Sequence, residues 1–352
     1  MSAHLCFANM ASPYRDGTIS GSAMTNRNID ILNEKIFIEL HKENHTALYK
    51  IDYYIKCDSS GMQVPLLFYA VNYQDNFNVW IDNKKVKVED IPEGSSDVNR
   101  HPLQNFEETL KSSDWVQNLG QELEFKDIKY FEVELTEGDH HIHVEYTGQA
   151  MTYRGDWVNK YSYTYSLYPA KFWRSFNSLE IAIKILNGDT DLKTNLGNPM
   201  TGPLDSTAVW RFDKLPADEI KFSYIPQVNF LAKTLINVTP FGLTMLFFIS
   251  MTVVHYRHIH KHRINNPDKK YSWVNIVGII VVPLLTLIWF IWSFELIDTV
   301  IGEEASRYHG YTFLVIIFYP VVLLFYWYIL RLVTSFLFAK RFINSVYNEL
   351  NK

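Results

Sequence analysis

Cysteine is nearly absent from this chain, which contains only Cys6 and Cys57 among its 352 residues. At most one disulfide bond can form, so a small domain held together by several disulfides is excluded. A chain of this length exceeds one typical domain, and we therefore expect two structural units. Hydrophobic residues make up 47% of the sequence and charged residues 20%, which also excludes a disordered chain.

Known catalytic signatures are missing as well. The sequence contains no Gly-x-Ser-x-Gly elbow, no Walker phosphate loop, no dinucleotide-binding fingerprint and no His-Glu-x-x-His motif. These absences do not exclude an enzyme, but they make a binding protein the favoured expectation. No catalytic residue and no cofactor-binding residue can be named from the sequence.

Charge is absent from three long apolar runs in the C-terminal third of the chain. Residues 234–254, 271–294 and 310–330 contain no Asp, Glu, Lys or Arg. An α-helix needs about 20 apolar residues to cross a bilayer core. We therefore expect an all-α anchor in residues 230–352, with transmembrane helices at about 234–254, 271–294 and 310–332. Each run contains one proline, which is expected to kink its helix.

The charges beside these runs predict how the chain is oriented. The connection between the first two runs is basic, whereas the connection between the second and third is acidic. By the positive-inside rule the basic loop and the C-terminal tail are cytoplasmic, and the N-terminal region lies outside, in the periplasm of a bacterium. The basic residues would also contact anionic lipid headgroups; they are Arg257, Lys261, Arg263, Lys269 and Lys270.

The N-terminal region is acidic: residues 1–229 contain 22 Lys and Arg against 32 Asp and Glu. An acidic region argues against a nucleic-acid partner. Residues 1–8 resemble the end of a signal peptide cleaved after Ala8, which would remove Cys6 and leave Cys57 as a lone thiol. A Cys6–Cys57 disulfide is the alternative.

Alternating apolar and polar residues predict that the exported region is mainly β. Asp82-Asn83 is a turn signal, and residues 131–135 and 142–146 are expected to form a hairpin through Glu137-Gly138-Asp139. The strand total exceeds one immunoglobulin-like antiparallel sandwich, so either two sandwiches or one enlarged sandwich is expected. We favour two, with the units 9–104 and 127–229 separated by a helical insertion at 105–126.

Together, the CFANMASP segment, the strand pair, the TEGDHHIHVEYTG segment and the C-terminal apolar helices resemble uncharacterised bacterial envelope proteins. These proteins carry an exported β-sandwich tethered to the inner membrane. The resemblance is architectural and implies no activity for this chain.

One candidate metal site lies in the sequence His141-Ile142-His143-Val144-Glu145. In a strand, His141 and His143 point to the same face, where two imidazoles can share a zinc ion. The sequence identifies no third ligand, so a solvated strand face is the simpler expectation. A zinc cofactor is the alternative to having no cofactor.

A second candidate is an aromatic surface containing Tyr161, Tyr163, Tyr165, Trp157 and Trp173. The three tyrosines share one face of a strand and could bind a sugar or a protein partner. Packing in a sandwich core, or in an aromatic belt at the membrane, is the alternative interpretation.

The sequence thus favours a membrane-anchored, non-enzymatic envelope protein. In this interpretation its sandwich binds or scaffolds a protein partner, and its helices dock against other membrane or envelope proteins. The alternatives are a zinc-dependent envelope enzyme centred on His141 and His143, and a sensor that binds cell-wall glycans.

Overall fold

The computed structural model describes residues 8–11, 26–58, 62–70, 73–90, 128–167, 170, 173–186, 192–202, 207–266, 272–332 and 335. The chain divides into two compact units. The first contains residues 1–153 and 159–226 and is mainly β, while the second contains residues 154–158 and 227–352 and is helical. Cys6, the proposed helical insertion at 105–126, Lys269 and Lys270 lie outside the described residues.

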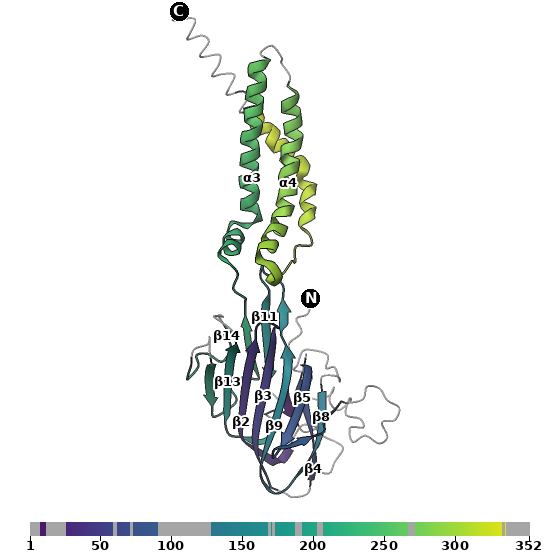
Figure 1. Cartoon of the computed structure of the whole chain (residues 1–352), viewed down its shortest axis with the longest axis vertical. Helices are drawn as coiled ribbons and strands as arrows, with labels where there is room; N and C mark the ends of the chain where they lie inside the picture. Colours follow the sequence, from purple (N-terminus) through teal and green to yellow (C-terminus); the bar gives the residue numbers. More distant parts are fainter. Residues whose placement is uncertain are drawn as a thin grey trace, which may run out of the picture. The chain divides into compact units, whose positions relative to one another are not determined.

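A large eight-stranded sheet organises the β unit (Figure 1). Its order is β15-β13-β2-β3-β9-β5-β6, and β12 also pairs with β2. Strands from both halves of the region are therefore mixed in one sheet, so the expected division into sandwiches at 9–104 and 127–229 is wrong. The strands are β2 (Asn26–His41), β3 (Thr46–Cys57), β5 (Tyr73–Ile81), β6 (Lys84–Val86), β9 (Gly138–Gln149), β12 (Trp173–Phe176), β13 (Leu179–Leu186) and β15 (Thr207–Phe212).

The pairing within this sheet departs from the expected antiparallel pattern. β13 and β12 both pair with β2 in parallel, whereas β3 pairs with the other side of β2 in antiparallel register. A parallel pair needs a long connection, and here that connection passes through all the strands between β2 and β12.

Two four-stranded sheets accompany the large sheet among the described residues of the β unit. One has the order β1-β4-β8-β7 and the other β10-β11-β16-β14. The expected hairpin at 131–146 is wrong, because β8 pairs with β4 while β9 pairs with β3 and β5 in the large sheet. The Asp82-Asn83 turn is confirmed, with φ values of 48° and 66° between β5 and β6. The smaller sheets contain β1 (Ala8–Ala11), β4 (Met62–Ala70), β7 (Glu89–Asp90), β8 (Ile128–Leu135), β10 (Met151–Tyr153), β11 (Lys160–Ser166), β14 (Lys193–Thr194) and β16 (Glu219–Tyr224).

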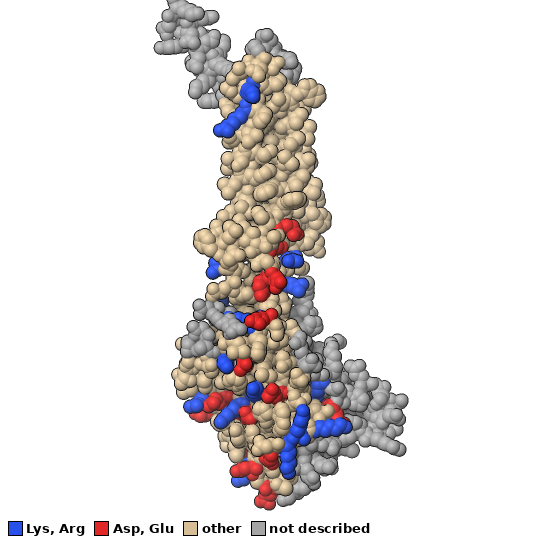
Figure 2. Space-filling model, viewed as in Figure 1, with Lys and Arg blue, Asp and Glu red and all other residues tan. Residues whose placement is uncertain are grey.

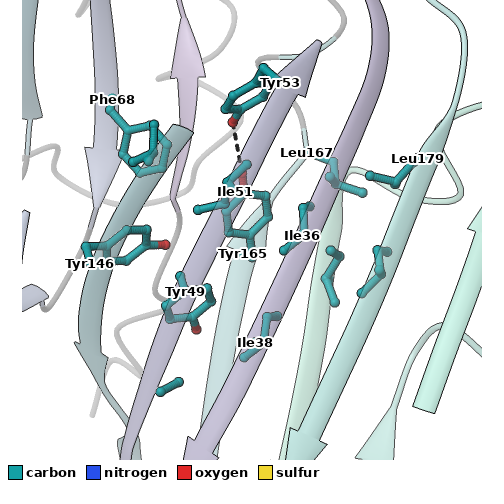
Figure 3. Packing of buried hydrophobic residues seen from close by; sticks show 14 of the residues in the cluster. Ile36, Ile38, Tyr49, Ile51, Tyr53, Phe68, Tyr146, Tyr165, Leu167 and Leu179 are labelled. Carbon is teal, nitrogen blue, oxygen red and sulfur yellow. Dashed lines mark hydrogen bonds between the residues drawn. The ribbon is translucent and has the colours of Figure 1, made fainter. Parts of the chain in front are cut away.

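One face of the large sheet packs against the two smaller sheets. Tyr49 of β3 stacks 6.1 Å from Tyr165 of β11, and Phe68 of β4 meets the ring of Tyr146 on β9 at 5.4 Å. Figure 3 shows these rings together with isoleucines of β2 and β3 in one apolar layer. Burial of this layer is the main source of stability, because apolar area removed from water contributes about 25 cal/mol per Å².

A β-bulge in β2 decides which of its side chains enter this core. Ile29 and Ile31 point inward, but the register with β3 shifts between Ile31 and Asn33. After the shift the inward positions are even-numbered, so Glu34 is fully buried opposite Tyr53. The bulge thus places a carboxyl group where alternation without a bulge would place it in solvent.

Among its described residues, the helical unit contains three helices long and apolar enough to cross a membrane, as expected. These are α3 (Phe230–Asn265), α4 (Trp273–Ile301), which continues through η4 (Gly302–Glu304), and Thr312–Leu332, whose first part is η5 (Thr312–Phe318). Figure 2 shows that charged side chains are sparse along the surface of these helices.

The expected proline kink is present in the first helix. Thr239, which precedes Pro240, has φ 64° and ψ 159° and breaks the helical backbone. Further along α3, His255 hydrogen-bonds the Tyr326 hydroxyl at 2.7 Å and the Val274 carbonyl oxygen at 2.9 Å. These contacts hold the three helices together.

Candidate metal centre

The side chains of the candidate site come from neighbouring strands of the large sheet. Along β9, Ile142, Val144 and Tyr146 are buried, whereas His141 and His143 are only partly buried on the opposite face. This confirms the prediction that the two histidines share a face. β3 runs antiparallel to β9, and Asp52 lies directly opposite His143.

Asp52 brings the two histidines together. Its Oδ1 atom lies 2.7 Å from Nε2 of His141 and 2.7 Å from Nδ1 of His143. One possible ligand atom from each residue lies within 4.8 Å of the other two. Asp52 is not predictable as a partner from the sequence, because its approach to the histidines depends on the register between β3 and β9. Its only local signal is a carboxylate at an outward position of a strand.

The electrostatics of this cluster couple the three groups. Burial alone would raise the pKa of the Asp52 carboxyl, but hydrogen bonds from His143 and His141 outweigh it and lower that pKa. The hydrogen bond to Asp52 raises the pKa of His143 against the opposing effect of burial, and Glu145 adds to the increase. The cluster therefore stabilises positive charge next to the Asp52 carboxylate, whether that charge comes from protons on the histidines or from a metal ion.

The three ligand atoms suit a small divalent cation. Zinc–nitrogen bonds of about 2.1 Å in a tetrahedral site would separate neighbouring ligand atoms by about 3.4 Å. The present N···O distances of 2.7 Å would then widen by less than about 1 Å as the metal replaces the shared protons. The three side chains are 25–31% exposed, which leaves a fourth coordination position open to solvent.

Neighbouring groups fix the orientation of both imidazoles. The Tyr54 ring stacks on His141 with ring centroids 4.7 Å apart, and Trp80 lies 5.3 Å from His143. On its other nitrogen, Nε2 of His143 lies 3.7 Å from Glu145 Oε2. Such outer contacts hold a metal-binding histidine in one tautomer and one ring orientation.

The turn before β6 anchors the start of β9. Asp82 accepts a hydrogen bond from the backbone N–H of His141 at 3.0 Å, and its second oxygen lies 2.8 Å from Nδ1 of His140. Nε2 of His140 lies 2.8 Å from the Thr136 carbonyl oxygen. His140 is thus used in fixing the backbone beside the site, while His141 and His143 remain directed at Asp52.

The expected aromatic surface is not formed. Tyr161, Tyr163 and Tyr165 are buried at 5%, 2% and 0% exposure, so they are part of the core. Trp173 is also buried. The reason is that β11 turns its tyrosine face toward the large sheet, where Tyr165 meets Tyr53 and Tyr49.

Trp157 and the basic residues belong to the helical unit. Trp157 packs against Phe294 and His309, with centroids 5.6 Å and 4.7 Å away. Three of the five basic residues, Arg257, Lys261 and Arg263, lie near the C-terminal end of α3.

The site also corrects the function favoured by the sequence. The non-enzymatic scaffold expected from the sequence depends partly on the lack of an identifiable third ligand for His141 and His143. Asp52 offers a possible third ligand, and this arrangement favours the zinc-dependent alternative over the scaffold. The absence of known catalytic motifs does not argue against such a site, because its possible ligands come from two strands, β3 and β9, that are far apart in sequence.

Comparison with known proteins gives little further information. No protein-family model matches the sequence, and no curated protein matches it. A structure of native yeast leukotriene A4 hydrolase is 8% identical, with a TM-score of 0.34 over 60% of this chain and 31% of that chain. A second structure, of native leukotriene A4 hydrolase from Saccharomyces cerevisiae, is 9% identical, with the same TM-score over 60% of this chain and 32% of that chain. This chain spans about a third of their length, and likeness at this level carries no argument about fold or function.

Proposed function

We propose that this protein is a membrane-anchored, zinc-dependent enzyme whose metal ion is bound by Asp52, His141 and His143. The observation that carries the proposal is the convergence of one carboxylate and two imidazoles on one point of an open sheet face. Two nitrogen ligands and one oxygen ligand form a donor set typical of catalytic zinc, which keeps one position for water or substrate. Structural zinc sites, in contrast, usually have four protein ligands.

The chain's own residues would prepare this site for hydrolytic chemistry. Zinc supplies a Lewis acid and lowers the pKa of bound water toward neutrality. Asp52 and the two histidines would hold the ion, while Tyr54 and Trp80 keep the imidazole rings in place. Glu145 would orient His143 through Nε2 so that Nδ1 faces the metal. The partial exposure of the cluster gives a substrate access from solvent.

We also propose that the β unit lies on the outer side of the membrane, in an envelope compartment. The support is the charge distribution: basic residues gather at the C-terminal end of α3, and acidic residues occur between α4 and the third helix. The proposed enzyme would then act on a substrate outside the cytoplasm. Its three helices would serve as the anchor.

Metal binding by the purified full-length chain in detergent tests this function. After treatment with a chelator, zinc titration is expected to show one tight site per chain. Asp52→Asn and His143→Gln should each weaken zinc binding by more than the roughly 10–100-fold typical of residues that only orient a ligand. His41→Gln, which removes a histidine at the far end of β2, is the matched control and should bind zinc like the wild type.

Two results would contradict the proposal. One is a wild-type chain that binds no zinc while its circular dichroism spectrum shows folded β structure. The other is zinc binding that survives unchanged in both ligand variants, since the metal would then be held elsewhere.

A further inference from the structure

Two lysines flank the candidate metal centre on the same face of the large sheet. Lys35 of β2 pairs with Asp52, and Lys85 of β6 pairs with Trp80, which itself pairs with His143. Residues directly opposite one another in neighbouring strands project to the same face. The five residues therefore form one row across the sheet, in which Asp52 and His143 lie between the two lysines.

Aromatic rings hold these lysines toward the site. Nζ of Lys35 lies 5.3 Å from the centre of the Tyr54 ring, and Nζ of Lys85 lies 5.8 Å from the Trp80 ring. Those rings in turn contact the metal-ligand histidines. Within the part of the chain that the structure describes, neither lysine forms an ion pair with a carboxylate, so both charges are available to a ligand.

This local arrangement opposes the charge of the region as a whole. Residues 1–229 contain ten more acidic than basic residues and would repel an anion at long range. Lys35 and Lys85, which are not paired with carboxylates, lie beside a site that would hold a metal cation. This local positive charge indicates that the site binds a negatively charged ligand. A lysine ammonium is a point charge well suited to phosphate. A phosphate group carries nearly two negative charges at neutral pH, whereas a carboxylate carries one, so phosphate is the better match for a site that offers a metal ion and two nearby ammonium groups.

We propose that the substrate of this metal centre carries a phosphate group, which binds at the metal and is attracted by the ammonium groups of Lys35 and Lys85 on its two flanks. The inference rests on the metal-dependent function proposed above and names its substrate class. Tyr54 and Trp80 offer ring surfaces beside the phosphate position, where an organic part of the substrate can pack. The anchoring metal contact gives affinity, and the lysines select for anions.

Phosphate titration of the cobalt-loaded full-length chain tests this proposal. Cobalt replaces zinc as a visible probe, and the detergent must carry no phosphate. Inorganic phosphate should change the cobalt absorption spectrum. Lys35→Gln and Lys85→Gln should each raise the phosphate dissociation constant about fivefold, the upper range for an exposed charge contact. The double variant should raise it more than tenfold, and added salt should reduce these differences.

Lys84→Gln is the matched control, because it removes the same charge from the neighbouring position of β6, which projects to the other face. Its phosphate affinity should equal that of the wild type. Cobalt bound with phosphate affinity unchanged in the Lys35 and Lys85 variants would overturn this inference and leave the metal site standing. Absence of bound cobalt in the wild type would overturn both.

Discussion

Replacing Glu34 by glutamine should change the pH dependence of stability in a predictable direction. Glu34 is fully buried by the bulge in β2, and the Tyr165 hydroxyl donates a hydrogen bond to its Oε1 atom at 3.2 Å. Burial raises the pKa of this carboxyl to about 8, although hydrogen bonds from Tyr165 and Tyr53 partly lower it. At neutral pH the folded protein therefore holds a proton here that the unfolded chain has lost.

The sign and size of the effect follow from this difference. Between an unfolded pKa of 4.5 and a folded pKa of about 8, folding takes up a proton, so stability decreases as the pH rises. Each unit of pKa difference is worth about 1.4 kcal/mol, which gives a total of up to about 5 kcal/mol. Glutamine has the shape of the neutral acid and no proton to lose, so Glu34→Gln should remove this contribution.

Thermal unfolding of the full chain in detergent at pH 5 and pH 8.5 measures the effect. The midpoint of Glu34→Gln relative to wild type should be higher at pH 8.5 than at pH 5, by roughly 8–16 °C for the about 4 kcal/mol that is lost between these two pH values. Glu137→Gln, at an exposed position between β8 and β9, is the control and should differ equally from wild type at both pH values. A Glu34→Gln variant with the same difference at both pH values would refute the reasoning.

Three further predictions concern the metal site, the core and the helices. Zinc affinity should fall as the pH is lowered from 8 to 6, because the raised pKa of His143 lets protons compete with the metal. If zinc titrations give an affinity that does not change with pH, this would count against His143 as a ligand. Tyr165→Phe should lower the free energy of unfolding by about 1–3 kcal/mol in denaturant titrations, since it removes the hydrogen-bond donor to the Glu34 carboxyl and a 3.1 Å contact with the Tyr53 hydroxyl. An unchanged unfolding midpoint would argue against these hydrogen bonds. Gly278→Ala should destabilise the helical unit by about 1–3 kcal/mol, because the added Cβ would lie 1.9 Å from Nε2 of His255. A thermal unfolding midpoint in detergent equal to that of the wild type would contradict this packing.

The features that sequence predicted well are those determined by local composition. The three charge-free runs are enough to indicate membrane-spanning helices, because a bilayer requires only length and apolarity. Likewise, the alternation along residues 141–146 correctly separates the histidine face from the buried face. The Asp82-Asn83 turn is also local, since both residues readily adopt positive φ.

The features that sequence did not predict depend on which strands pair. A hairpin was expected between 131–135 and 142–146 because they are separated by turn residues, yet β8 and β9 join different sheets. Asp52 lies at an outward position of β3, and nothing in its local sequence indicates which side chains it will contact. Only the register of β3 with β9 shows that it contacts His141 and His143. The bulge at Leu32 similarly has no local signature, although it determines that Glu34 is buried.

The position of β2 in the interior of the large sheet, with partners on both sides, has a consequence for how the chain folds. One side of β2 can pair at once with β3, which follows after a short turn. The other side of β2 can pair only after β12 and β13 have been synthesised. The distance along the chain is large, since Asn33 hydrogen-bonds Ser178, 145 residues further on. Contacts of such long range slow folding, and an unpaired strand edge promotes aggregation in the meantime. During synthesis one edge of β2 therefore stays open until residue 186 has emerged, and this interval is when the protein would most need protection by a chaperone.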